Sequence, residues 1–382
     1  MASPHVITSQ NVPGIEQLPQ ELVDRIVDQL GPDIRALKIC ALLSRRWHPR
    51  SSRNLSRRAW LHVRSSDDQA ELMRSVDEQQ AFLGKISCLS LAKIKFEPLH
   101  VVKALPRLRE LNITDCDIPW DGPDAVRAWR AEPTTRTLSV LEMDSVHLIL
   151  AHRLLLAFSA VDTLRIRLMG FSISLPDCLP SPRPHLVKKL EVTALARVPL
   201  QYLSATLDSS ALKSLKVDIY HLRQFDHPAM VHDFVQAIGH GLCEYHHVVR
   251  AVPLPDMPAT PRLSTFTGVK SVTLTVEIPV VSKQLQAVLA FVESLPVGLR
   301  SIKVVCRRSF DGEEALVWAM QAVRWTTLFQ GLERCRQLSR LEIRAEPEGW
   351  AQDASPLAFS PAAQAVVLGA LPETLRRIVA FA

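Results

Sequence analysis

A short alternating phrase recurs along most of the chain: an aliphatic residue, any residue, and a second aliphatic residue. It occurs at residues 89–91, 111–113, 141–143, 164–166, 190–192, 215–217, 272–274, 302–304 and 341–343. Alternation of this kind is typical of short strands with one buried face. The first five intervals between the phrases are 22, 30, 23, 26 and 25 residues. Such spacing predicts structural repeats that bury their apolar sides against one another.

Between the phrases lie stretches whose apolar residues recur every three or four positions, as in helices. These stretches cover residues 67–82, 125–130, 230–239, 283–295 and 315–332. One strand and one helix per repeat predict a parallel sheet with helices beside it, arranged as a curved solenoid. We therefore expect an α/β fold in which residues 61–382 form an irregular array.

Two parts of the array are less regular. The interval from Leu215 to Val272 is 57 residues long and predicts either an insertion or an unrecognised repeat, with one helix and a proline-rich loop. A second proline-containing loop is expected over residues 345–361. Segments 105–113, 295–304 and 371–380 each begin with Leu-Pro and end in a strand-like phrase. Segment 371–380 also resembles residues 18–21, but its match to the other two favours a last repeat.

The N-terminal residues follow a helical pattern. A helix is expected over residues 19–30, because Pro19 is tolerated at a first helical position and Gly31-Pro32 ends the helix. The run 34–47 is apolar on more than one side and is expected to end before Pro49. A module this short has too little interior to be stable without a partner. The sequence therefore predicts a protein-binding surface here.

These two runs resemble the F-box motif, especially as it occurs in large fungal families. The resemblance rests on Leu-Pro-x-Glu-Leu at residues 18–22 and Leu-Leu-Ser-Arg-Arg-Trp at residues 42–47, and it covers about residues 15–60. Leu43-Ser44 stands where many relatives carry Val-Cys. The resemblance implies a three-helix module that docks on a Skp-type adaptor. That adaptor joins a cullin and a RING subunit in an SCF ubiquitin ligase, and the F-box protein chooses the substrate.

Carried over by motif position, the implied adaptor-binding residues are Leu18, Pro19, Leu22, Ile26 and Leu30, with Leu37, Leu43 and Trp47 supporting or extending their surface. The array resembles degenerate leucine-rich repeats, although the asparagine that usually follows the strand is absent. The chain is therefore expected to comprise a disordered tail at 1–14, an F-box at 15–60 and a substrate-binding array at 61–382. The expected function is a non-catalytic receptor that presents a protein target for ubiquitination. The alternative is a leucine-rich-repeat scaffold without ligase linkage, whose helical start is only a cap.

Composition narrows the classes further. Hydrophobic residues make up 47% and charged residues 22%, which predicts a folded chain. A net charge of +6 weakly favours acidic partners and argues against a dedicated nucleic-acid binder. No leader pattern and no run of eighteen apolar residues occurs, so neither secretion nor a membrane partner is expected. Seven scattered cysteines favour reduced, buried thiols in a cytoplasmic or nuclear protein.

Two further clusters invite a functional interpretation. His240, Cys243 and His247 have the spacing of zinc-type ligands on a helix, but a second ligand pair is missing, which favours a solvated helix end without a metal. Arginines 45, 46, 50, 53, 57, 58 and 64 form a basic belt, interpreted as a solvated linker surface in preference to a phosphate-binding one. Hydrolase elbows, zinc-protease helices and phosphate loops are absent, so neither an enzyme nor a cofactor is expected.

Overall fold

The computed structural model describes residues 18–30, 34–57, 59–78, 83–84, 86–94, 98–116, 136–170, 184–193, 197–218, 229–249, 261–277, 282–308, 313–347 and 359–381. Within them, twelve parallel strands form one sheet, and their order in space is their order in the chain. The strands are β1 (Ala59–Val63), β2 (Ile86–Ala92), β3 (Glu110–Thr114), β4 (Thr137–His147), β5 (Ala160–Gly170), β6 (Leu186–Thr193), β7 (Ser214–Asp218), β8 (Glu244–Val249), β9 (Ser271–Glu277), β10 (Ser301–Arg308), β11 (Arg340–Pro347) and β12 (Val379–Phe381).

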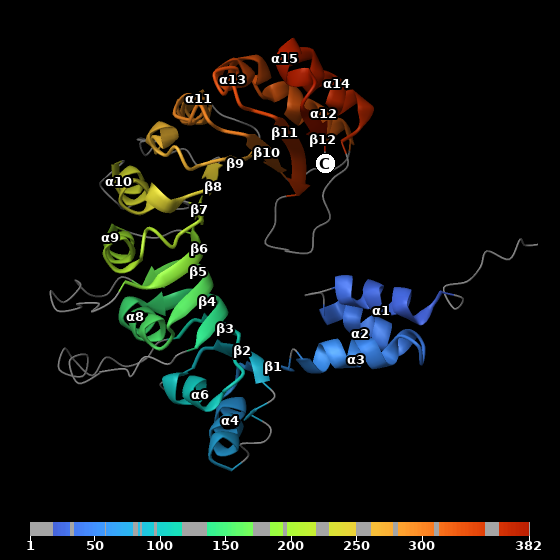
Figure 1. The fold of residues 1–382 in the computed structure, drawn as a ribbon, viewed down its shortest axis with the longest axis vertical. Coiled ribbons are helices and arrows are strands. Elements are labelled where there is room, and N and C mark those ends of the chain that lie inside the picture. The colour runs from blue at the N-terminus through green and yellow to red at the C-terminus, as the bar shows by residue number, and fades with distance from the viewer. Residues whose placement is uncertain are drawn as a thin grey trace, which may run out of the picture.

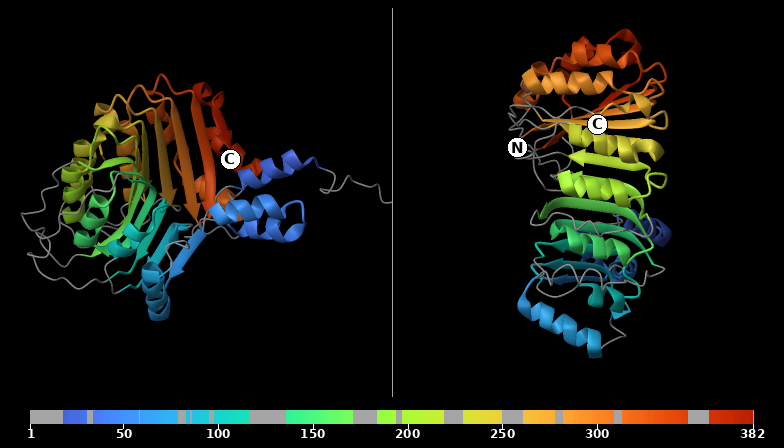
Figure 2. Two further views of the ribbon diagram at one scale, coloured as in Figure 1. Left: turned by 60° about the horizontal axis from the view of Figure 1, so that its bottom comes forward. Right: turned by 90° about the vertical axis from the view of Figure 1, so that its left-hand side faces the viewer.

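Helices precede the sheet and connect its strands. The first three are α1 (Gln20–Gln29), α2 (Ile34–Leu43) and α3 (His48–Arg57). The others are α4 (Ser66–Glu78), α6 (Pro98–Ala104), α8 (Leu148–Leu156), α9 (Arg197–Thr206), α10 (Ala229–Ile238), α11 (Ser282–Glu293), α12 (Glu313–Ala322), α13 (Trp325–Leu332), α14 (Pro361–Ala370) and α15 (Glu373–Arg376). Figure 1 shows the sheet along the inside of an arc and the connecting helices along its outside. In the right-hand view of Figure 2 these helices stack on the outer face.

All nine predicted phrases lie in strands, and they are aligned with one another across the sheet. The first residues of the nine phrases and Tyr245 of β8 pair in the series Leu89, Leu111, Leu141, Leu164, Leu190, Leu215, Tyr245, Val272, Ile302 and Leu341. Each of these side chains is at most 1% exposed. Because a slip of one residue would turn an apolar row toward solvent, this burial fixes the register of every strand. The middle residues of the phrases face the concave side.

The long interval from Leu215 to Val272 contains a repeat that the sequence pattern did not reveal. Tyr245 of β8 pairs with both of these residues, so 57 residues divide into steps of 30 and 27. The proline-rich part, residues 250–260, lies outside the described residues. At the other end, β12 pairs with β11, which confirms that segment 371–380 ends in a last repeat.

The predicted helices are found with adjusted ends. Helices α4, α10 and α11 match three of the predicted stretches, while the stretch 125–130 lies outside the described residues. The stretch 315–332 forms two helices, because the chain turns at Val323 and the Trp325 indole donates to the Met320 carbonyl at 2.8 Å. Helix α8 was not predicted because its residues are apolar on nearly every side, and six of them are buried.

Three consecutive repeats share one backbone conformation, which follows β2 at Lys93, follows β3 at Asp115 and lies within β4 at Ser145. Lys93, Asp115 and Ser145 all have φ between 50° and 54°, in the left-handed region, and they follow residues that are paired in register. The Lys93 amide donates to the Thr114 carbonyl and the Asp115 amide to the Asp144 carbonyl, each at 3.0 Å. The next residues are buried and apolar: Ile94, Cys116 and Val146. Backbone hydrogen bonds and the burial of apolar residues thus stabilise this conformation, whereas regular leucine-rich repeats use an asparagine side chain after the strand.

The left-handed backbone at Lys93 predicts an unusual response to substitution. Lys93→Gly should raise the free energy of unfolding by about 0.5–1 kcal/mol, because glycine adopts this conformation without Cβ strain. Lys93→Val should lower it by about 1–2 kcal/mol. Ala92→Gly, one residue earlier within β2, is the control and should be destabilising. Urea unfolding would check all three, and a destabilising Lys93→Gly would contradict the explanation.

Candidate functional site

Helices α1, α2 and α3 form a small helical unit, here called the N-terminal module (residues 18–57). Its core consists of Val23, Val27, Leu37, Cys40 and Trp47, with Leu18 and Leu30 packed at the margin. This cluster is separate from the apolar core of the sheet and its helices. In Figure 1 the module lies apart from the outer helical layer, at the β1 end of the chain's path.

Polar contacts fix how the helices of the module meet. The Asp28 carboxylate, near the end of α1, accepts a hydrogen bond from Arg50 Nε of α3 at 2.7 Å. The Arg46 guanidinium donates to the Leu18 carbonyl, and Gln20 Nε2 donates to the Arg46 carbonyl at 3.0 Å. The start of α1 is therefore tied to the turn that follows α2.

Large apolar side chains are exposed on α1 and on α2. On α1, Leu22 is 43% and Ile26 is 39% exposed. On α2, Ile39 is 59%, Leu42 87% and Leu43 63% exposed. Spacings of four on α1, and of three and four on α2, place each set on one helix face. These five residues, here called the apolar surface, are five of the eight exposed large hydrophobic residues in the described chain.

Each of these helices therefore has two apolar sides. Val23 and Val27 of α1 are fully buried, directly beside the exposed Leu22 and Ile26. Solvent contact with large apolar side chains is unfavourable, so this group is a candidate binding surface. The arrangement fits the expectation that so short a module has too little interior for its apolar residues.

The residues predicted to bind the adaptor divide into three sets. Pro19, Leu22, Ile26 and Leu43 are exposed, while Leu18 and Leu30 are half-buried. Leu37 is fully buried and Trp47 is 9% exposed, so both belong to the core and can only support the surface. Ile39 and Leu42 were not among the predicted adaptor-binding residues, although Leu42 lies within the motif; Ile39 lies outside it. The signal was the two-sided apolar character of the second run.

Both predicted helix ends in the module need correction. Helix α1 begins at Gln20, and Pro19 precedes it in an extended conformation as the N-cap. Helix α2 ends at Leu43, and Pro49 lies in the first turn of α3 instead of ending the second helix. Proline is tolerated in a first turn because the amide it lacks has no partner within the helix there. The predicted tail, residues 1–14, lies outside the described residues.

The expected histidine-rich helix end does not exist. His240 belongs to a short 3-10 turn, Gly239–Gly241, and His247 lies in strand β8. His247 is buried, its ring stacks on Phe291 at 4.6 Å between centroids, and burial lowers its pKa to about 4. His240 and Cys243 are exposed. Among the residues described, no group of three potential ligands is placed to hold a metal ion.

The cysteines and the basic belt were predicted only in part. The described cysteines are free thiols and five are buried, but Cys243 is exposed; Cys178 lies outside the described residues. Burial raises the pKa of Cys116 to about 11 and that of Cys306 to about 12, which disfavours a reactive thiolate. In the belt, Arg46 and Arg50 hold the module together, whereas Arg45 and Arg64 are exposed.

Two further histidines, His152 and His185, are buried close to each other. His152 Nδ1 is 2.6 Å from the Tyr202 hydroxyl, and its ring lies 6.4 Å from that of His185. Burial, followed by the nearby His185 and Arg153, lowers the pKa of His152 from 6.5 to about 4. Burial also lowers the pKa of His185, whose Nε2 has no hydrogen-bond partner among the described residues. Both imidazoles are neutral in the folded chain at neutral pH.

These pKa values predict acid sensitivity. The folded-state pKa of His152 is about 4 and the ordinary value is 6.5, so between these values the unfolded chain binds more protons. The free energy of unfolding should therefore fall as the pH drops through this window and change little above it. His185→Leu should reduce this fall, because one of the two buried imidazoles with a lowered pKa is removed. Urea unfolding of both proteins across the window measures the difference; equal pH dependence would contradict the assignment.

A comparison with models of known protein families and with curated proteins finds no match to this chain. Among the described helices, none has both the length and the apolar character needed to cross a membrane.

Proposed function

We propose that this chain is an F-box-type substrate receptor, which docks on a Skp-type adaptor through its N-terminal module and presents a protein target to a cullin-RING ubiquitin ligase. The observation that carries the proposal is the apolar surface: Leu22, Ile26, Ile39, Leu42 and Leu43 are exposed beside a complete small core. Each such side chain contributes about 1.5–3 kcal/mol when fully buried. Covering the surface with a partner helix would therefore be strongly favourable.

The rest of the chain supports the receptor role. The strand phrases and their spacing are similar to those of leucine-rich repeats, and the parallel sheet carries polar residues at the middle position of every phrase. The module and the array have separate cores, so each can bind its own partner. In this proposal the chain performs no chemistry, because it raises the local concentration of the target at the catalytic subunits.

Capture of the adaptor tests the module. The wild-type chain should copurify with a Skp-type adaptor, and the double variant Leu22→Asp, Ile26→Asp should lose it, because two carboxylates would be buried unpaired. Both residues are exposed, so the variant should fold normally. The matched control is Leu186→Asp in the array, since Leu186 is 45% and Leu22 is 43% exposed. The control should bind as well as the wild type.

The same assay separates the contributions of the two helices. Ile39→Asp, Leu42→Asp should also abolish capture, since these α2 residues extend the same apolar surface. Circular dichroism would establish that each variant keeps its helices and strands. A wild-type chain that does not bind the adaptor, or binds it no better than the folded double variants, would rule out the proposed function.

The alternative is a repeat scaffold without ligase linkage, in which the module merely caps the array. Deletion of residues 1–57 separates the two, because a cap shields the end of the array from solvent. Since the module has its own core, we expect the deletion to leave the melting temperature of the array nearly unchanged and to abolish adaptor capture. A large drop in melting temperature would favour the cap.

A further inference from the structure

The positive charge of this chain is concentrated in the N-terminal module. Residues 18–57 contain eight Lys and Arg residues against four Asp and Glu residues, a net charge of +4. The rest of the chain contains 37 against 35, a net charge of +2 over more than eight times the length. A local excess of one sign attracts partners of the other sign and fixes how they dock. The module is therefore the part of the chain whose charge favours an acidic partner.

Most carboxylates of the module are engaged within it. Asp24 accepts a hydrogen bond from the Gln20 side-chain amide at 2.9 Å, and Asp28 accepts one from Arg50 Nε at 2.7 Å. The Glu21 carboxylate is exposed and has no hydrogen bond or ion pair among the residues described. The fourth carboxylate lies outside the described residues. The carboxylates of the described module thus leave its exposed cations largely without counter-charges.

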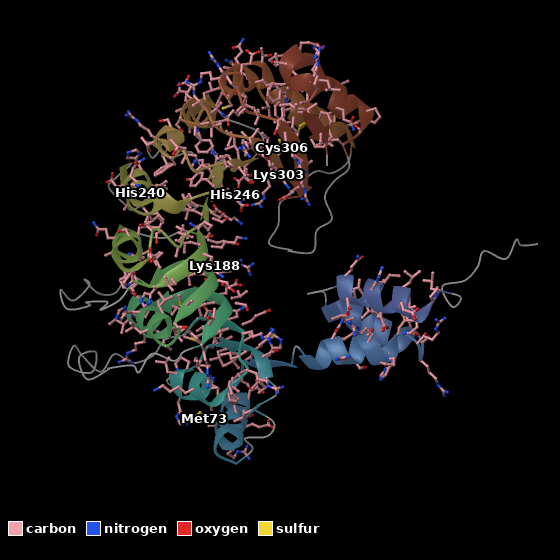
Figure 3. All side chains as sticks on the ribbon, viewed as in Figure 1. Met73, Lys188, His240, His246, Lys303 and Cys306 are labelled. Carbon is pink, nitrogen blue, oxygen red and sulfur yellow. The ribbon has the colours of Figure 1, made fainter. Side chains whose placement is uncertain are left out.

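Three exposed cations lie beside the apolar surface. Arg25 is three positions after Leu22 on α1. Lys38 is four positions before Leu42 on α2, and Arg45 is three positions after it, in the turn that follows the helix. Spacings of three and four make side chains neighbours on a helix surface. None of the three cations has an ion pair within the described part of the chain. In Figure 3, side chains that end in nitrogen reach outward from the module.

We propose that the partner covering the apolar surface is an acidic protein, which presents an apolar strip bordered by Asp and Glu side chains. The strip would bury the five exposed aliphatic side chains, and its carboxylates would pair with Arg25, Lys38 and Arg45 at the rim. Rim charges mainly raise the association rate and exclude wrong partners, whereas buried apolar contacts determine how long a complex lasts. That this partner is a Skp-type adaptor rests on the proposed function.

An anionic lipid surface also combines apolar groups with negative charge, but Glu21 argues against it. Glu21 directly precedes Leu22, so its exposed carboxylate lies at the edge of the apolar surface. A membrane would place anionic head groups against this carboxylate as well as against the cations. A protein can place its carboxylates opposite the cations alone and leave Glu21 in solvent. A protein partner therefore fits the arrangement better.

Two designed peptides test the proposal on the full-length chain. One is a fluorescein-labelled helical peptide with leucines along one face and glutamates on both flanks. In the other peptide, lysines replace the glutamates. Fluorescence anisotropy should show that the glutamate peptide binds about tenfold more tightly at low salt, and that this preference shrinks at high salt because exposed ion pairs are screened.

Substitution of the three cations should remove the preference. The triple variant Arg25→Gln, Lys38→Gln, Arg45→Gln should bind the glutamate peptide about eightfold more weakly, from roughly twofold for each exposed charge. Glu21→Gln should instead tighten binding about twofold, which a loss of structure cannot mimic. The matched control removes one lysine and two arginines that are exposed in the array: Lys103→Gln, Arg107→Gln, Arg300→Gln. It changes the net charge equally and should leave binding unchanged.

Three results would each overturn this inference: equal binding of the two peptides, a control variant that weakens binding as much as the triple variant, or binding of phosphatidylserine vesicles without binding of the glutamate peptide. Adaptor capture separates the inference from the proposed function. A chain that prefers the glutamate peptide but captures no adaptor rejects only the proposed function. A chain that shows no peptide preference, and captures the adaptor equally with and without the three cations, rejects only this inference.

Discussion

The structure depends on the burial of one aliphatic or aromatic row, which runs from Leu89 to Leu341 through neighbouring strands. No strand buries this row alone, since each side chain is covered by the repeats on either side and by the outer helices. The burial of this row fixes the register of the strands. The register in turn determines which side chains are neighbours on the opposite face of the sheet. Glu191 meets Lys216 only because Leu190 and Leu215 are paired beneath them. Core packing and surface chemistry are thus two sides of one alignment.

The N-terminal module follows a different rule. Its core of five residues is complete without the array, yet it leaves five large apolar side chains in solvent. In the array, apolar residues are buried by the next repeat, whereas α1 and α2 have no next repeat. The apolar surface is therefore left in solvent by the module's own core, and this supports the proposal that a partner covers it. The array buries its apolar rows within itself, whereas the module leaves apolar side chains exposed. This contrast underlies the proposed division between target binding by the array and adaptor docking by the module.

Much of the array could be predicted from sequence, because aliphatic residues at a fixed offset have one physical explanation in a sheet. Strand β8 was not predicted, because its two buried positions hold the aromatic rings of Tyr245 and His247 and the pattern requires aliphatic residues there. Leu42 lies within the motif and Ile39 outside it, and neither was predicted to be exposed, because exposure depends on how α2 packs. The ion pair between Glu191 and Lys216 could not be predicted, because these residues are 25 positions apart in the chain and meet only through the pairing of β6 with β7. The sequence therefore predicts the apolar rows of the sheet, whereas the charged residues that form ion pairs are known only from the fold.

The strand order has a consequence for how the chain folds. Since β1 to β12 are neighbours in space in the order in which they are synthesised, nearly every contact closes a loop of one repeat or less. The entropy cost of loop closure is then small at each step, and native structure can extend repeat by repeat from any folded pair. A nascent chain emerging from the ribosome would already carry its sheet in final order, with β1 and the current last strand as its two edges.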